Sequence, residues 1–299
     1  MRAVVFAYSN VGDRCLRVLH AGGVEVPLVV THRDHAGETI WFRRVADTAA
    51  ELQVPFVYAD DANDGALAAR VAAARPDLIF SFYFRAMIPL PLLALAKAGA
   101  FNMHGSLLPL YRGRAPVNWA VLHGATQTGA TLHEMVAKPD AGAIVDSSAV
   151  PILPDDTAAQ VFDKVTVAAE QVLWRSLPAI LAGRAPRRAN DLAAGSYFRA
   201  RTPEDGRIDW SQPAQRVYNL IRAVAPPFPG AFTDVGGTRL MVARARLRRG
   251  TVSASTPGLQ IERERVVGVC GDGGVIDVHE LRRGADAIDV ATLHQLLNR

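Results

Sequence analysis

Short apolar segments alternate with helix-like segments along residues 2–104, and this alternation restricts the fold more than any other feature of the chain. Segments suited to buried strands are Arg2–Ala7, Val24–Thr31, Phe56–Tyr58, Pro76–Phe82 and Phe101–His104. Helices are predicted between them, over Gly12–Ala21, Ile40–Leu52, Asn63–Ala74 and Ile88–Ala96. Strands and helices in this order favour a right-handed, doubly wound parallel sheet. We therefore expect an α/β fold with a Rossmann-like, mostly parallel sheet.

The pattern changes after Pro116. We expect two further strands at Gly129–Val136 and Ala143–Ile152, followed by a long amphipathic helix that ends near Leu181. The run Asp155-Asp156-Thr157 precedes this helix and supplies residue types that favour a helix start.

The last part of the chain combines one helix with several short strands. Val217, Leu220 and Ile221 have helical spacing within Trp210–Val224, and Gly and Pro then separate short β-like segments. Such segments favour a small barrel. The expected organisation is an α/β domain over residues 1–188, a linker over 189–200 and a β domain over 201–299.

Composition argues against several classes of protein. The chain is 49% hydrophobic and 21% charged, which is ordinary for a soluble globular protein. No apolar run approaches the ~20 residues that a membrane span needs, and no secretory leader pattern opens the chain. We therefore expect a cytoplasmic protein without a membrane partner. Cys15, Cys270 and the histidines match no metal-ligand spacing, so we expect no metal.

Charge and glycine patterns speak against two further ligands. The net charge is +4, but only three lysines occur and the arginines are scattered, so we expect no nucleic-acid partner. No G-x-G-x-x-G motif follows the first strand, which argues against a dinucleotide cofactor.

The densest group of chemically useful side chains lies at Phe101–Pro116, which reads F-N-M-H-G-S-L-L-P-L-Y-R-G-R-A-P, and at the later Pro-Asp-Ala-Gly. If the chain is a strand up to His104, Asn102 and His104 point to the same face, because side chains alternate along a strand. Ligands of α/β sheets usually sit at such strand ends. Asn102 would stabilise an oxyanion, His104 would move a proton, and Asp140 would orient or charge the imidazole. The trio therefore suits acyl transfer.

This motif resembles that of the formyltransferases that use N10-formyltetrahydrofolate, and the similarity extends along most of the chain. Further matching runs lie at residues 4–8, 31–34, 79–85, 141–145, 199–205 and 222–232. Within the family, the chain is most similar to the formyltransferase domains of bifunctional polymyxin-resistance proteins. Those domains formylate UDP-4-amino-4-deoxy-L-arabinose during lipid A modification.

The resemblance implies a catalytic domain followed by an OB-like C-terminal barrel, and an enzyme that formylates the amine of a sugar nucleotide. It implies N10-formyltetrahydrofolate as co-substrate and no metal. It places Asn102, His104 and Asp140 in the catalytic site. The folate contacts that it implies are the backbone of Ala86, Met87 and Ile88, the side chain of Arg114, and the loop residues Val136, Ala137, Lys138 and Pro139.

Three alternatives stay open at this point. The acceptor would be another 4-amino or 3-amino sugar nucleotide, or methionyl-tRNA, or the protein would bind folate without catalysis. Residues 31–42 contain one Arg and two acidic residues, where a tRNA-binding enzyme would be expected to carry a basic loop. The intact Asn102, His104 and Asp140 set argues against a pure folate binder.

The polymyxin-resistance relatives also carry a second, NAD-dependent decarboxylase half. This sequence shows no such half up to Arg299. We therefore expect a separate decarboxylase and a separate aminotransferase to act in the same pathway.

Overall fold

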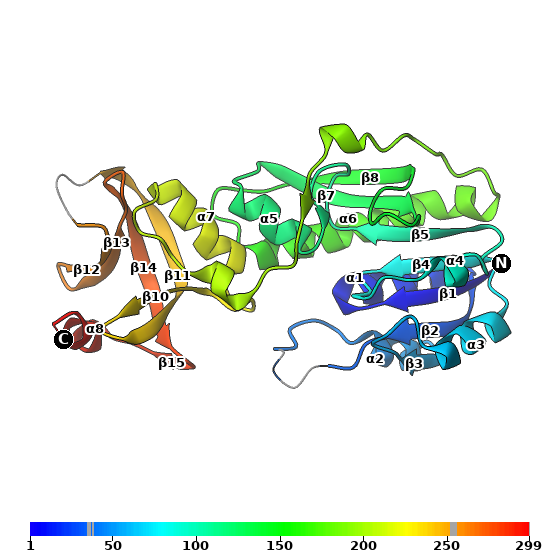
Figure 1. The fold of residues 1–299 in the computed structure, drawn as a ribbon, viewed down its shortest axis with the longest axis horizontal. Helices are drawn as coiled ribbons and strands as arrows, with labels where there is room; N and C mark the ends of the chain where they lie inside the picture. The colour runs from blue at the N-terminus through cyan, green and yellow to red at the C-terminus, as the bar shows by residue number, and fades with distance from the viewer. Residues whose placement is uncertain (35–36, 38, 252–255, 299) are drawn as a thin grey trace. The chain divides into compact units, whose positions relative to one another are not determined.

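The structure is a computed structural model that describes residues 1–34, 37, 39–251 and 256–298 (Figure 1). Among these residues, seven strands form one sheet in the order β3-β2-β1-β4-β5-β7-β8. Their bounds are β1 (Arg2–Ala7), β2 (Glu25–Thr31), β3 (Phe56–Tyr58), β4 (Leu78–Phe82), β5 (Gly99–His104), β7 (Gln127–Glu134) and β8 (Ile144–Pro151). Strands β1 to β5 pair in parallel, and β7 runs antiparallel to β5. The expected, mostly parallel sheet is confirmed.

The strand order reverses between β1 and β4, because β2 and β3 lie on one side of β1 while β4 and β5 lie on the other. In doubly wound sheets, ligands bind outside the carboxyl ends of the strands at such a reversal. The carboxyl ends of β1, β4 and β5 are therefore the expected place for a site.

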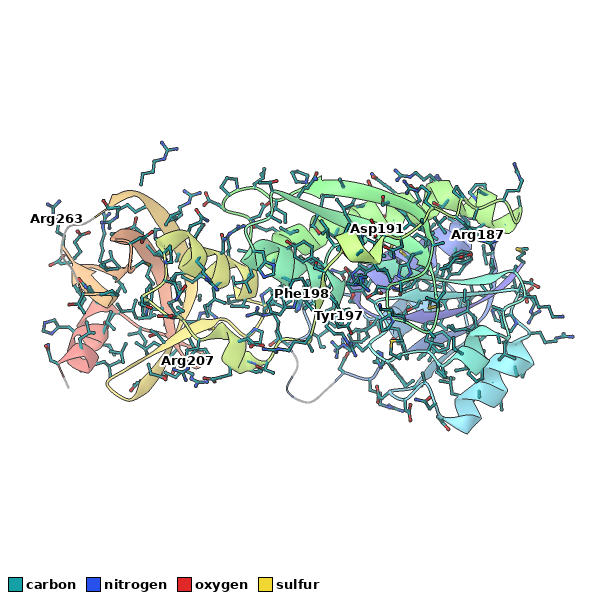
Figure 2. The ribbon with its side chains drawn as sticks, turned by 45° about the horizontal axis from the view of Figure 1, so that its top comes forward. Arg187, Asp191, Tyr197, Phe198, Arg207 and Arg263 are labelled. Carbon is teal, nitrogen blue, oxygen red and sulfur yellow. The ribbon has the colours of Figure 1, made fainter. Side chains whose placement is uncertain are left out.

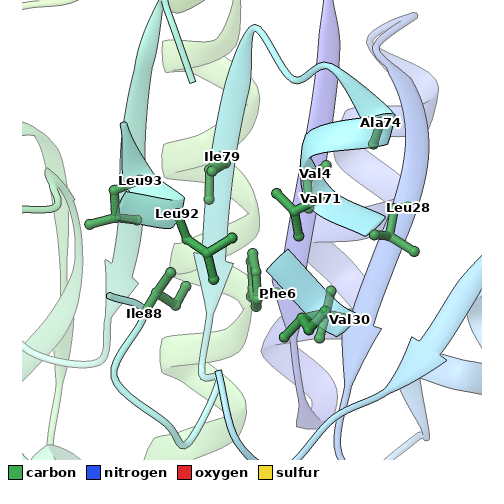
Figure 3. Packing of buried hydrophobic residues seen from close by; sticks show 11 residues of the cluster. Val4, Phe6, Leu28, Val30, Val71, Ala74, Ile79, Ile88, Leu92 and Leu93 are labelled. Carbon is green, nitrogen blue, oxygen red and sulfur yellow. The ribbon is translucent and has the colours of Figure 1, made fainter. Parts of the chain in front are cut away.

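Continuous apolar runs form the buried strands of this sheet. Residues Ala3 to Ala7 of β1 are fully buried, as expected of a strand covered on both faces. Figure 3 shows how Val71 and Leu92 pack over the side chains of the central strands. The full cluster consists of Val4, Phe6, Leu28, Val30, Leu67, Val71, Ala74, Ile79, Ile88, Leu92 and Leu93.

The helices that accompany the strands are α1 (Ser9–Ala21), α2 (Val45–Glu51), α3 (Gly65–Ala74), α4 (Leu90–Leu93), α5 (Pro116–Leu122) and α6 (Ala158–Leu181). Three of them are shorter than the sequence predicts: α3 by two residues, and α2 and α4 by more. The expected helix from Ile40 begins only at Val45, because Arg44 before it has an extended backbone; in the preceding segment Trp41 packs edge-to-face on Phe162. The expected helix from Ile88 begins at Leu90. Ile88 precedes Pro89, and the helical backbone conformation is disfavoured for a residue that precedes proline.

The C-terminal β domain is an antiparallel, curled sheet, and this confirms the expected fold class. Its strands pair in the order β10-β11-β14-β13-β12, with β15 beside β14. The elements are α7 (Ala214–Val224), β10 (Ala231–Val235), β11 (Thr238–Thr251), β12 (Gly258–Glu262), β13 (Arg265–Val269), β14 (Gly274–Arg283), β15 (Asp286–Ala287) and α8 (Val290–Leu297).

The chain divides into two compact units that are discontinuous in sequence. The first contains residues 1–116, 128–150 and 162–199, and the second contains residues 117–127, 151–161 and 200–299. Buried Arg222 binds the separate pieces of the second unit together, because its guanidinium donates to the carbonyl oxygens of Asp156 and Val121 at 3.1 and 3.5 Å. The boundaries expected at residues 188 and 201 stay a prediction.

Within the described part of the chain, no helix combines the length and the apolar composition that crossing a bilayer would require.

Candidate functional site

The candidate site lies in the first unit, at the end of β5. Asn102 is paired in register with Ser81 of β4 and with His133 of β7, and His104 is paired with Thr131. Met103 between them is 1% exposed and points into the core, so Asn102 and His104 share the opposite face of the strand. The imidazole of His104 is only 6% exposed. The strand therefore presents an amide and a buried imidazole side by side.

Asp140 reaches this face from the loop between β7 and β8. Its Oδ1 lies 3.5 Å from Nδ1 of His104 and 3.5 Å from Nε2 of His133, and the Gly113 N–H donates to its Oδ2 at 2.8 Å. The carboxylate is thus placed between two imidazoles. The structure brings the three predicted residues Asn102, His104 and Asp140 into one cluster, joined by His133.

The loop that carries Asp140 is held in an unusual backbone conformation. Asp140 has φ +49°, and Asn190 Nδ2 donates to the carbonyl oxygens of Asp140 and Gly142 at 3.0 and 3.1 Å. A Cβ on Gly142 would lie 1.9 Å from the carbonyl oxygen of Glu134, so only glycine allows this close approach. Asn190 and Gly142 together fix the position of the carboxylate.

Hydrogen bonds determine the tautomer of His104. Its Nε2 lies 2.8 Å from the carbonyl oxygen of Tyr111, and a carbonyl oxygen can only accept, so Nε2 carries the proton. Nδ1 then faces Asp140 and is the nitrogen that can accept a proton. Burial lowers the pKa of His104, against the opposing effect of Asp140, and Arg112 adds to the lowering. His104 is therefore neutral at neutral pH.

Asp140 is ionised. Burial alone would raise the pKa of this carboxyl, but attraction to the imidazoles of His104 and His133 in their charged forms, together with the Gly113 N–H, outweighs burial. They hold the pKa of Asp140 well below its usual range. A fixed negative charge beside Nδ1 of His104 favours the imidazolium once a proton arrives there.

His133 is a further member of the cluster that the sequence does not single out. Its Nδ1 donates to the carbonyl oxygen of Glu134 at 2.8 Å, which leaves the lone pair on Nε2. Asn102 Nδ2 donates to that lone pair at 3.1 Å, and this bond fixes the amide. The second N–H of Asn102 remains for another acceptor. Only the pairing register of β5 and β7 reveals this role, and a single sequence does not contain it.

The loop after β5 supplies the Tyr111 carbonyl that bonds His104 and the Gly113 N–H that bonds Asp140. Strand β6 (Arg112–Gly113) pairs with β9 (Tyr197–Phe198), and Ser196 Oγ accepts from the Tyr111 N–H at 2.8 Å. Figure 2 labels Tyr197 and Phe198 in this segment. The 189–200 stretch, expected to be a linker, thus supplies Asn190 and Ser196, which position the loops around the trio.

Arg112 is a second residue whose position the sequence does not reveal. The side chain is buried, and its Nε and Nη1 have no hydrogen-bond partner among the described residues. Its positive charge lowers the pKa of His104. A buried cation beside a neutral imidazole and an ionised carboxylate adjusts how readily the site takes up a proton.

The residues predicted to contact folate lie in two segments, apart from Arg114. Ala86, Met87 and Ile88 follow β4, while Val136, Ala137, Lys138 and Pro139 lead to Asp140. Buried Ile88 belongs to an apolar cluster against which Met135 also packs, so the two segments share one region of the unit. Met87 and Val136 are 55% and 43% exposed, so both apolar side chains are open to contact with a ligand. Arg114 is exposed, and its N–H donates to the carbonyl oxygen of Phe198 at 3.0 Å.

Over the described residues, no group of three or more His, Cys, Asp or Glu side chains is arranged to hold a metal ion. The site itself presents the amide of Asn102, the imidazoles of His104 and His133 and the carboxylate of Asp140. These groups at a strand end of a doubly wound sheet define an α/β protein equipped for proton transfer and oxyanion stabilisation.

Comparison with known families identifies the class more closely. Residues 1–177 match the formyl transferase family, and residues 201–296 match the formyl transferase C-terminal domain. The chain belongs to the formyl transferase family and is a transferase enzyme.

Several solved structures share the fold. An N-formyltransferase from Helicobacter canadensis, in complex with folinic acid and dTDP-3-aminofucose, is 17% identical with a TM-score of 0.72, over 92% of this chain and 98% of that one. The sugar 3N-formyltransferase WlaRD, with dTDP and 5-N-formyl-THF, is 17% identical with a TM-score of 0.71, over 97% of this chain and 98% of that one. HypX from Aquifex aeolicus, in complex with tetrahydrofolic acid, is 19% identical with a TM-score of 0.67, over 97% of this chain and 46% of that one.

Proposed function

We propose that the protein transfers a formyl group from N10-formyltetrahydrofolate to the amine of a sugar nucleotide, with UDP-4-amino-4-deoxy-L-arabinose as the acceptor. The observation that carries this proposal is the placement of Asn102, neutral His104 and ionised Asp140 around one strand end. Relatives of the same fold bind folate derivatives and dTDP-linked amino sugars, which supports both substrate classes.

In the proposed reaction the acceptor amine attacks the formyl carbon, a new C–N bond forms, and the bond from that carbon to N10 of the folate breaks. The carbonyl oxygen carries negative charge in the intermediate. Asn102 donates its second N–H to this oxyanion, and a donor of this kind typically contributes ~10²–10³ in rate.

The amine loses a proton in this reaction and the departing N10 gains one. His104 Nδ1 accepts the proton, directly or through water, and ionised Asp140 stabilises the resulting imidazolium at 3.5 Å. The same nitrogen then returns the proton to N10. The Tyr111 carbonyl keeps Nε2 protonated throughout, so the proton moves through Nδ1 alone.

The folate co-substrate would lie against Ala86, Met87 and Ile88 on one side and the Val136–Pro139 loop on the other. The backbone of the first segment offers donors and acceptors to the pterin ring. Exposed Met87 and Val136 would cover its apolar faces. Arg114 would contact the donor with its charged side chain.

A second candidate acceptor is a dTDP-linked 3-amino sugar. Two structures of the same fold contain dTDP-3-aminofucose or belong to a sugar 3N-formyltransferase. Either acceptor would place the enzyme in the cytoplasm, downstream of an aminotransferase and, for the arabinose nucleotide, of a decarboxylase.

The test is a formylation assay with mass detection of the added formyl group. N10-formyltetrahydrofolate is offered with UDP-4-amino-4-deoxy-L-arabinose, UDP- and dTDP-linked 3-amino and 4-amino sugars, and methionyl-tRNA. Transfer to the arabinose nucleotide alone supports the proposal, and transfer only to a dTDP 3-amino sugar favours the second candidate. Transfer to tRNA, or to no acceptor while folinic acid still binds, contradicts it.

Two variants link activity to the site in the same assay. His104→Ala should abolish turnover while folinic acid still binds. Arg114→Ala should raise the KM for the formyl donor. Exposed Arg249, in the second unit, has no partner among the described residues, so Arg249→Ala is a matched control that should change neither quantity.

A further inference from the structure

His32 is a buried histidine outside the catalytic trio. It lies directly after β2 and is 5% exposed. Its ring stacks on Phe84, with the ring centroids 4.1 Å apart, and meets Tyr8 edge-to-face at 5.4 Å. These contacts from the ends of β1 and β4 fix the plane of the imidazole at the reversal of strand order.

The two ring nitrogens of His32 have different partners. The backbone N–H of Arg85 donates to Nε2 at 2.9 Å, so Nε2 carries a lone pair. Nδ1 lies 3.1 Å from Oδ1 of Asp60 and therefore carries the proton that Asp60 accepts. The bonds specify one neutral tautomer of a ring that is already fixed in orientation.

The Arg85 amide lies directly before Ala86, Met87 and Ile88, the segment expected to pair with the pterin. Strand β4 ends at Phe82, and the next residue, Tyr83, has φ +60°, so the chain turns sharply out of the sheet. A side chain from the end of β2 thus anchors the backbone between this turn and the expected folate contact.

We propose that His32 is a positioning residue for the formyl donor: its Nε2 holds the Arg85 amide and thereby sets the backbone of Ala86–Ile88 for pairing with the pterin ring. This inference rests on the proposed function, because it takes that segment to be the folate contact. His32 itself touches neither reacting group. Its effect is expected in donor binding and in the KM for the donor, and only weakly in the KM for the acceptor.

Two substitutions separate the hydrogen bond from the bulk of the ring, and a third serves as the control. His32→Gln retains an acceptor for the Arg85 N–H. His32→Phe retains the aromatic contacts with Phe84 and Tyr8 but has no acceptor. His279→Ala removes an exposed histidine of the second unit and is the matched control.

Calorimetry measures the affinity for folinic acid and needs no acceptor sugar. Removing the side-chain acceptor of the Arg85 N–H in His32→Phe should weaken folinic acid binding about 10- to 100-fold. His32→Gln should stay within about 3-fold of the unmodified protein, and His279→Ala should bind equally well. In turnover assays the KM for the donor should rise in His32→Phe, with kcat changed less.

The outcomes distinguish this inference from the proposed function. If the unmodified protein does not bind folinic acid, the proposed function fails at its first step and this inference falls with it. If the unmodified protein binds and His32→Phe binds equally well, only the role of His32 is refuted. Equal losses in His32→Gln and His32→Phe also refute the hydrogen-bond role.

A second measurement needs no substitution and so does not depend on a variant folding. Nitrogen-15 NMR of the histidine rings at neutral pH should show His32 protonated at Nδ1 and bare at Nε2. A protonated Nε2 would overturn the proposal, because that nitrogen could not accept the Arg85 N–H.

Chemical rescue provides a third measurement. A cavity of about 290 Å³, lined by Tyr8, Thr31, His32 and Tyr58 among others, opens beside the ring. Imidazole added to His32→Ala should therefore enter this space and restore donor binding in part. An absence of rescue in a folded variant would count against the hydrogen-bond role.

Discussion

Replacing Asp140 by Asn tests the electrostatic core of the site with the smallest possible change. The side chain keeps its shape, and its oxygen can still accept the Gly113 N–H that now donates at 2.8 Å. The negative charge 3.5 Å from Nδ1 of His104 disappears. The amide that replaces it can donate to Nδ1 and so stabilises the neutral imidazole.

The magnitude is set by the loss of an opposite charge at this distance. A charge within about 4–6 Å changes a pKa by roughly 1–3, and each pKa step corresponds to ~1.4 kcal/mol. Asp140 is largely buried, so solvent screens this interaction little. The imidazolium that forms during proton transfer would lose roughly 1.4–4 kcal/mol of stabilisation, which predicts a fall in kcat of roughly 10- to 1,000-fold.

The assay is kcat and kcat/KM for formyl transfer between about pH 5 and 9. Activity requires neutral His104, so it rises with pH through the pKa of this residue, which burial places below the usual value for histidine. Asp140 opposes that lowering. Asp140→Asn should therefore move the acidic limb of the pH–activity profile to still lower pH while kcat falls. Exposed Asp286 provides the control Asp286→Asn. A variant with nearly normal kcat and an unmoved limb would refute the reasoning.

Three further changes have predicted outcomes. Arg112→Gln removes a cation that lowers the pKa of His104, so the acidic limb in the same assay should move to higher pH, the opposite direction from Asp140→Asn. Asn190→Ala removes two hydrogen bonds from the loop that carries Asp140, and thermal unfolding should show a loss of roughly 1–3 kcal/mol, while Arg188→Ala, which removes an exposed side chain nearby, should show little. Gly142→Ala forces a Cβ against the Glu134 carbonyl, so kcat and the melting temperature should both fall, and an unchanged kcat would contradict the fixed loop.

Much of the first sheet was predictable because its signals are local. The short apolar run Ala3–Ala7 is typical of a buried parallel strand, and the two-residue spacing of Asn102 and His104 places both on one face once β5 is recognised. The direction of β7 was not predictable in the same way. An apolar strand pattern does not state whether its neighbour runs parallel or antiparallel, and that choice brings His133 opposite Asn102.

The supporting residues of the site were harder to predict because their roles depend on contacts far along the chain. Asn190 and Ser196 lie in a polar stretch that has the composition of a linker, yet they hold the Asp140 loop and the Tyr111 amide. His32 likewise gains its role only when β2 and β4 end on the same edge of the sheet. Sequence pattern locates side chains that could take part in catalysis. Strand register and the paths of the loops decide which of these side chains come into contact.

The two histidines beside Asp140 have different tasks, and their hydrogen bonds enforce the difference. His133 must keep its Nε2 lone pair, because Asn102 donates to it and would lose its orientation if that nitrogen were protonated. His104 must take up a proton at Nδ1, and its Nε2 is already committed to the Tyr111 carbonyl. Since Asp140 Oδ1 is equidistant from both, charge alone does not select the base. The amide of Asn102 makes that selection, so an Asn102→Ala variant should lose oxyanion stabilisation and also allow His133 to compete for the proton.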